Sequence, residues 1–146
     1  MTSGDINGRV ITQRAIWIKD MLQSLRELPL ENEETFLDNK HLVAAAESYL
    51  RRALEALFDL GRHILAKKFA YPAPEYKKIA VGLAEKHVIE GKNAELMRIM
   101  AGYRNRMVHF YQEITPKELF QICSQNLSDI EQLLEALLKW VRSNTE

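Results

Sequence analysis

Apolar residues recur every three or four positions along almost the whole chain, and this spacing limits the fold more than any other feature of the sequence. Between Ile11 and Leu25 the apolar positions are separated by four, three, four and three residues, which gives an amphipathic helix one apolar face. We find no run of alternating apolar and polar residues of the kind that predicts a half-buried strand. The sequence therefore predicts an all-α protein.

Signals for helix ends divide the chain into about five helices. Pro29 ends the first, because the residue before a proline is displaced from helical backbone angles. Thr115 followed by Pro116 is a strong start signal, with a capping hydroxyl and then a proline at the first helical position. The expected helices run from about Ile11 to Pro29, Thr35 to Lys68, Ile79 to Gly91, Asn93 to Tyr111, and Thr115 to the C-terminus. Their short connections favour an antiparallel bundle.

Length and composition bound the domain organisation and the partners. A chain of 146 residues, 47% of them apolar, fits one globular domain spanning residues 1–146. Twenty Lys and Arg balance 20 Asp and Glu, so the molecule as a whole has no basic field that would bind nucleic acid indiscriminately. Any nucleic-acid partner must be held by a local patch.

The chain carries no sign of membrane insertion or export. No stretch approaches the roughly 18 to 20 apolar residues that a membrane span needs. The first residues lack the basic and apolar regions of a secretory signal. Cys123 is the single cysteine and cannot form an internal disulfide. We therefore expect a cytoplasmic protein with no membrane partner.

Most enzyme signatures are absent. The sequence has no glycine-rich phosphate loop, no His-Glu-x-x-His and no Gly-x-Ser-x-Gly. We expect no metal and no cofactor. His63 and His87 lie near apolar positions and are interpreted as bundle histidines with satisfied nitrogens, His41 as a surface residue, and Cys123 as a small buried apolar residue.

Charged residues of the second expected helix also have a simple structural interpretation. Glu47, Arg51 and Glu55 are spaced four residues apart, which indicates a row of solvated ion pairs.

The fourth expected helix has more than one apolar face. Leu96, Ile99, Met100, Tyr103, Met107 and Phe110 form one face that can dock on the bundle. A second face beside it consists of Met97, Ala101, Arg104, Val108 and Tyr111. Deep burial of the whole helix is one explanation, but an arginine and a tyrosine are poor choices for a dry core. We favour contact of this second face with another subunit.

A third face of the same helix holds groups that can bind phosphate and move protons. It consists of Arg98, Gly102, Asn105 and His109. A glycine inside a helix costs roughly 1 kcal/mol, which is easier to understand if something approaches the backbone there. A histidine titrates near neutrality and can transfer protons. Arginines at positions 98, 104 and 106 can bind phosphate oxygens. The residues alone indicate a phosphate-binding, proton-transfer site.

The run from Tyr103 to Tyr111, Tyr-Arg-Asn-Arg-Met-Val-His-Phe-Tyr, resembles the Arg-x4-His-x-Tyr signature of the HEPN superfamily, in the branch of HepT-like toxins of prokaryotic toxin–antitoxin pairs. The order of helices resembles that family from about Ile11 to Val141, although only this run is diagnostic.

The resemblance implies a metal-independent endoribonuclease that acts as a homodimer, with Arg104 and His109 as catalytic residues. It implies that Tyr111 receives AMP from an MntA-like nucleotidyltransferase antitoxin, and it matches Asn105 to the polar residue that often follows the motif arginine. Asn105, which can orient the His109 ring, and Tyr111, whose hydroxyl can help to position RNA, are expected to support catalysis. Arg98 and Arg106 lie outside the strict motif, so their expected role in RNA binding rests on the helical wheel.

The geometry of a straight helix adds a prediction about assembly. Arg104 and His109 would lie roughly 140° apart around the helix axis. We therefore expect a two-fold dimer to bring Arg104 of one subunit towards His109 of the other. Two alternatives stay open: a HEPN module that binds nucleotides or partners without catalysis, and a purely structural helical adaptor.

Overall fold

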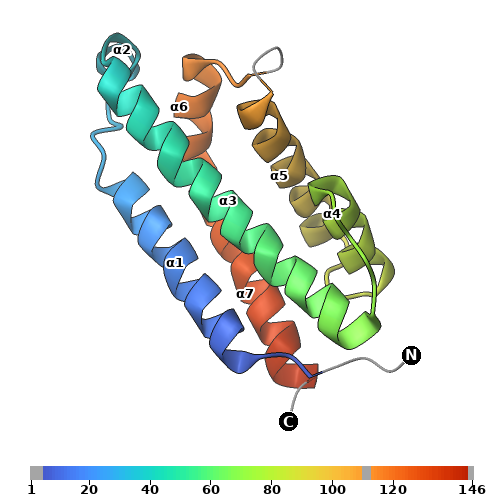
Figure 1. Ribbon diagram of the computed structural model, residues 1–146. Coiled ribbons are helices and arrows are strands. Elements are labelled where there is room, and N and C mark those ends of the chain that lie inside the picture. The colour runs from blue at the N-terminus through green and yellow to red at the C-terminus, as the bar shows by residue number, and fades with distance from the viewer. Residues whose placement is uncertain (1–4, 110–112, 145–146) are drawn as a thin grey trace.

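The structure, a computed structural model, describes residues 5–109 and 113–144. The described residues form helices and connecting loops and contain no strand (Figure 1). The helices are α1 (Gly8–Arg26), α2 (Glu33–Asp38), α3 (Lys40–Phe69), α4 (Tyr76–Glu85), α5 (Lys92–Val108), α6 (Pro116–Gln125) and α7 (Leu127–Asn144).

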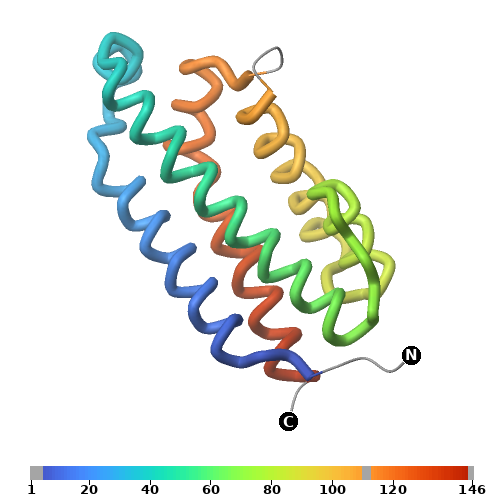
Figure 2. The backbone as a smooth tube through the Cα atoms, viewed as in Figure 1, coloured from blue at the N-terminus to red at the C-terminus, as the bar shows by residue number. Residues whose placement is uncertain are grey.

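Four long helices set the architecture. Successive long helices α1, α3, α5 and α7 run in opposite directions along the molecule, as the tube in Figure 2 shows. The short helices α2 and α6 lie together at one end of the bundle, and α4 lies beside α5 and the C-terminal part of α3 (Figure 1). The expected all-α antiparallel bundle is confirmed.

Helix α3 forms the centre of the core. Its predicted apolar face is buried, from Leu42 to Ile64, and only Tyr49 of that face remains partly exposed. Side chains from α1 and α7 close over it, among them Ile18, Leu22 and Leu134. Burial of such apolar surface is the main term that stabilises the bundle.

Two of the five expected helices are divided, and asparagines mark both divisions. Asn39 has extended backbone angles and its Oδ1 accepts hydrogen bonds from the backbone N–H groups of His41 and Leu42, so it ends α2 and caps α3. Asn126 is the C-cap of α6: its backbone N–H donates to the Ile122 carbonyl at 2.9 Å and its side-chain amide donates to Asp129 at 3.2 Å, before α7 begins at Leu127. Local capping thus overrides the continuous apolar periodicity.

Helix α5 ends earlier than the spacing predicts. The expected helix reached Tyr111, whereas α5 ends at Val108. His109 follows as the C-cap with extended backbone angles (φ −101°, ψ 101°), and its N–H donates to the Asn105 carbonyl at 3.2 Å. The prediction that His109 shares a helical face with Arg98 is therefore wrong.

Candidate functional site

The two halves of α5 have different environments. In the N-terminal half Leu96, Met97, Met100 and Ala101 are buried among the other helices. Met97 and Ala101 belong to the face that was expected to contact another subunit, and for these two residues that prediction is wrong. Only towards the C-terminal end does this face open, where Val108 is 43% exposed.

Arg104 lies between α3, α4 and α5, and its charge is balanced within the chain. Its Nε and Nη2 donate to Oε2 of Glu55 at 3.2 and 3.1 Å. The two side chains are 21% and 28% exposed, so the pair is only partly solvated. A carboxylate on this edge fixes the plane of the guanidinium, because the planar group donates in fixed directions. The sequence-based argument that Arg104 needs a second subunit as partner is therefore wrong.

An aromatic ring supports the same guanidinium. The Cζ of Arg104 lies 4.1 Å from the centroid of the Tyr76 ring, and the Cζ of Arg62 lies 5.7 Å from that centroid. Phe58 packs edge-on against the same ring. Burial is the main cause that raises the pKa of the Tyr76 hydroxyl, and nearby Arg104 opposes it. Tyr76 thus remains a neutral ring whose face attracts a cation.

Glu55 and Tyr76 were not recognised as site residues from the sequence. Glu55 belongs to the predicted ion-pair row, and Arg51 indeed contacts Glu47 at 3.3 Å and Glu55 at 3.4 Å. The row is half-buried instead of solvated. Glu55 and Arg104 are 49 residues apart, so no local spacing could have joined them.

Three other candidate residues lie at the C-terminal end of α5: Asn105, Arg106 and His109. His109 is exposed and Asn105 is half-buried one turn before it. Arg106 donates two hydrogen bonds to Glu118 of α6, at 2.8 and 2.6 Å. That carboxylate raises the pKa of Arg106, so the side chain carries a full positive charge. Tyr111, the expected AMPylation site, lies outside the described residues.

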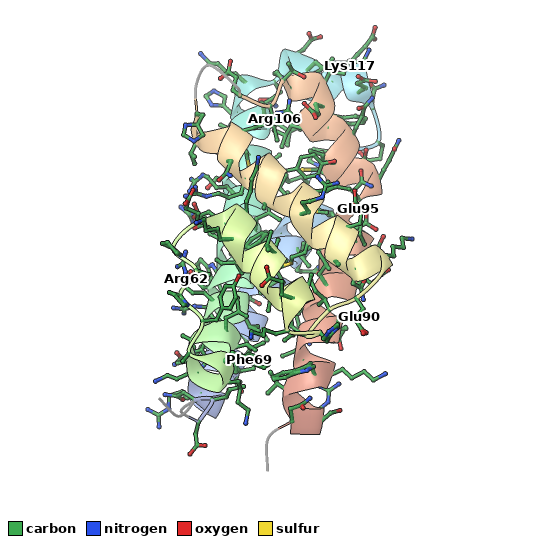
Figure 3. The ribbon with its side chains drawn as sticks, turned by 90° about the vertical axis from the view of Figure 1, so that its right-hand side faces the viewer. Arg62, Phe69, Glu90, Glu95, Arg106 and Lys117 are labelled. Atoms are coloured by element: carbon green, nitrogen blue, oxygen red, sulfur yellow. The ribbon has the colours of Figure 1, made fainter. Side chains whose placement is uncertain are left out.

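Arg98 is distant from this group along the helix. It pairs with Glu95 and is largely exposed. Figure 3 labels Glu95 and Arg106 at different points along α5, with Arg106 close to α6. The structure brings Arg104, Asn105, Arg106 and His109 to one end of α5 and leaves Arg98 away from them.

The three other histidines and the cysteine differ in how far they are buried. His63 is half-buried, and its Nε2 accepts a hydrogen bond from the backbone N–H of Asn7 at 3.0 Å, as expected of a satisfied bundle histidine. His87 is exposed with a positive φ of 58°, so the same interpretation is wrong there. His41 is exposed, and Cys123 is buried, as predicted; burial raises the pKa of its thiol to about 12.

Across residues 5–109 and 113–144, no group of three or more His, Cys, Asp or Glu side chains is arranged to hold a metal ion. No helix within the same ranges is long and apolar enough to cross a membrane.

Comparison with solved structures identifies the class of fold. The tri-AMPylated HEPN toxin of Shewanella oneidensis, in complex with an MNT antitoxin, superposes with a TM-score of 0.80 at 22% identity, covering 89% of this chain and 97% of the toxin. A toxin–antitoxin complex with AMP-PNP contains a chain with a TM-score of 0.78 at 21% identity, covering 88% of this chain and 97% of that one. The fold is that of the HEPN toxins.

The sequence identifies the family. The family described as "Ribonuclease HepT-like" matches residues 18–137. The chain belongs to this HepT-like ribonuclease family, and the resemblance inferred from the Arg-x4-His-x-Tyr run is confirmed. A search of curated proteins found no match.

Proposed function

We propose that this protein is the toxin of a prokaryotic toxin–antitoxin pair and a metal-independent endoribonuclease, with Arg104 and His109 as its catalytic residues. The observation that carries the proposal is the arrangement at the end of α5. A guanidinium fixed by Glu55 and Tyr76 precedes an exposed histidine that stands where the helix ends. Membership of the HepT-like ribonuclease family supports the reaction class.

RNA supplies its own nucleophile, so the protein needs only proton transfer and charge stabilisation. The 2′-oxygen attacks the adjacent phosphorus, the 2′-O–P bond forms, and the P–O5′ bond breaks. His109 takes the proton of the 2′-hydroxyl or gives one to the leaving 5′-oxygen. Arg104 stabilises the negative charge that develops on the phosphoryl oxygens. The products are a 2′,3′-cyclic phosphate and a 5′-hydroxyl.

The neighbouring polar residues have supporting roles in this proposal. Asn105 orients the His109 ring, one turn further along. Arg106 and Arg98 attract the RNA backbone, with Arg106 the stronger candidate because it is three residues before His109, whereas Arg98 lies in the N-terminal half of α5. Salt screens such contacts, so RNA affinity is expected to fall as ionic strength rises.

We further propose that the active form is a homodimer with the C-terminal end of α5 at its interface. The angular argument from a straight helix does not apply, since His109 lies beyond the end of α5. The support is instead the exposed apolar side chain of Val108 beside His109. One histidine serves poorly as both base and acid in a single step, and a shared cleft would supply two.

Control of the toxin completes the proposal. Tyr111 is proposed as the residue to which a nucleotidyltransferase antitoxin of MntA type attaches AMP. The toxin from Shewanella oneidensis is tri-AMPylated and bound to an MNT antitoxin, which supports this partner class. The added phosphate would neutralise charge if it paired with Arg104 or Arg106, and the adenine would block access for RNA.

The catalytic proposal is tested with purified protein and end-labelled RNA in the presence of EDTA. We expect the wild-type protein to cleave and His109→Ala and Arg104→Ala to lose cleavage while keeping their helicity. His41→Ala is the matched control, since His41 is exposed and lies far along the chain from α5. Undiminished cleavage by His109→Ala would exclude the mechanism, and RNA binding without cleavage by the wild-type would favour the binding module.

Assembly and control are tested separately. Mixing the inactive Arg104→Ala and His109→Ala proteins should restore part of the activity if each site draws on two subunits; an active monomer would contradict the dimer. After co-expression with the antitoxin, intact-mass measurement should show AMP additions on the wild-type protein and none on Tyr111→Phe. Additions that persist in Tyr111→Phe would place the modification elsewhere.

A further inference from the structure

A cleft between α1 and α3 lies outside the motif, and of its lining residues the proposed reaction uses only Glu55, which holds Arg104. It has a volume of about 400 Å³, within the range of small-ligand sites. Gln13, Arg14 and Trp17 of α1 form one wall, and Arg52, Glu55 and Asp59 of α3 form the other. The two helices run side by side over this stretch (Figure 1).

The most unusual residue in the cleft is Trp17. Its side chain is 44% exposed, although Ile18 beside it is fully buried. An indole borders the cleft and can stack on a flat ligand, and every nucleobase offers a flat aromatic face.

The cleft also offers donors and acceptors that suit the edge of a base. The carboxylates of Glu55 and Asp59 can accept hydrogen bonds from base amino groups, and the guanidinium groups of Arg14 and Arg52 can donate to ring nitrogens and carbonyls. Arg14 is weakly held: its Nε is buried 3.8 Å from Asp59 without a hydrogen-bond partner among the described residues, while the side chain as a whole is 42% exposed. Its guanidinium can therefore re-pair with a ligand at little cost.

Glu55 connects this cleft to the candidate catalytic site. The carboxylate that binds Arg104 through Oε2 is also part of the cleft wall. An RNA strand whose phosphate is bound by Arg104 would thus place a neighbouring nucleotide over α3, beside the cleft.

We propose that the cleft between α1 and α3 binds one unpaired base of single-stranded RNA, next to the nucleotide at the cleavage site, with Trp17 as the stacking platform. The inference deepens the proposed ribonuclease function and rests on it for the identity of the ligand. It adds a specificity-determining subsite on a part of the chain that the Arg-x4-His-x-Tyr motif does not include. The alternative occupant is a protein, either the antitoxin or a second copy, and the test separates the two.

The first experiment observes the indole directly. The chain has two tryptophans, so the Trp140→Phe variant in an inactive His109→Ala background leaves Trp17 as the single reporter. We expect a short single-stranded RNA to change the Trp17 fluorescence in a saturable way. An abasic strand of the same length should leave it unchanged, because it keeps the phosphates and lacks the bases. No change of Trp17 fluorescence with the intact strand, or an equal change with the abasic strand, overturns the proposal.

The second experiment measures cleavage and does not depend on the folding of the Trp140→Phe variant. We expect Trp17→Ala to raise KM about 5- to 150-fold, the range that corresponds to removal of one base–aromatic stack, with kcat within twofold. Ile16→Ala is the matched control, since Ile16 is 55% exposed on the same helix but does not line the cleft. Its KM should stay within twofold of the wild-type value.

The outcomes distinguish this inference from the proposed function. A Trp17 response to intact RNA in the first experiment, together with no cleavage by the wild-type protein in the second, would refute the ribonuclease proposal and keep the base-binding cleft. Cleavage with unchanged KM in Trp17→Ala would refute the cleft alone. Loss of dimerisation or of antitoxin binding in Trp17→Ala, with KM unchanged, would overturn the base-binding role and assign the indole to a protein contact.

Discussion

The contact between Arg104 and Glu55 can be measured as a coupling free energy with Glu55→Ala, Arg104→Ala and the double variant. The two hydrogen bonds of 3.1 and 3.2 Å join charged groups, for which about 1.5–3 kcal/mol is typical. Exposed ion pairs contribute about 0.2–1 kcal/mol, and this pair is only about a quarter exposed. In Arg104→Ala, Glu55 keeps its contact with Arg51, and in Glu55→Ala, Arg104 keeps its contact with the Tyr76 ring; both remaining contacts reduce the loss of stability. We therefore expect a coupling of about 1–2 kcal/mol.

Urea denaturation of the four proteins at one protein concentration gives this coupling, since the free energy of unfolding of a dimer depends on concentration. Lys19 and Glu135 provide the matched control, because they are 3.9 Å apart and about 60% exposed. Their coupling should stay below about 0.5 kcal/mol. A coupling between Arg104 and Glu55 no larger than the control value would refute the claim that Glu55 holds the Arg104 guanidinium.

Three further predictions concern histidine, glycine and cysteine. Burial is the main cause that lowers the pKa of His63 from its ordinary 6.5. As the pH falls, His63 is therefore protonated in the unfolded chain before it is protonated in the folded protein. The free energy of unfolding should therefore decrease as the pH drops below about 6.5, and urea denaturation at pH 7.5 and 5.5 should show a smaller decrease for His63→Gln than for His41→Gln. Gly102→Ala should stabilise the fold by about 0.5–1 kcal/mol, since its new Cβ meets nothing within 4 Å. Gly82→Ala should destabilise the fold by about 1–3 kcal/mol, since its new Cβ would lie 2.7 Å from the ring of Tyr71. Thermal denaturation measures both changes. Cys123 should react with a thiol reagent only after unfolding, because it is buried and its pKa is about 12; rapid labelling of the native protein would contradict this.

The apolar spacing was sufficient to predict the helical class and the core of α3, because burial of one helix face depends on positions within a single element. It could not predict where helices are interrupted. Asn39 and Asn126 divide two expected helices through local hydrogen bonds that a repeat of apolar residues does not encode. The end of α5 at Val108 was missed for a similar reason, since the apolar residues continue past it in the sequence.

The candidate site was predictable only in the part that is continuous in sequence. Arg104, Asn105 and His109 follow from one short run of residues. Glu55 and Tyr76 reach Arg104 through the packing of α3 and α4 against α5, which no local pattern reports. The burial of Met97 and Ala101 against their own chain also required the three-dimensional arrangement.

The chemistry of the RNA ends tests the central claim most directly. After digestion in EDTA by the wild-type protein, mass spectrometry of the fragments should show a 2′,3′-cyclic phosphate, or the 3′-phosphate formed from it, and a 5′-hydroxyl. These ends require attack by the 2′-oxygen, which is the step assigned to His109 and Arg104. Fragments with a 3′-hydroxyl and a 5′-phosphate would show attack by water and would contradict the account.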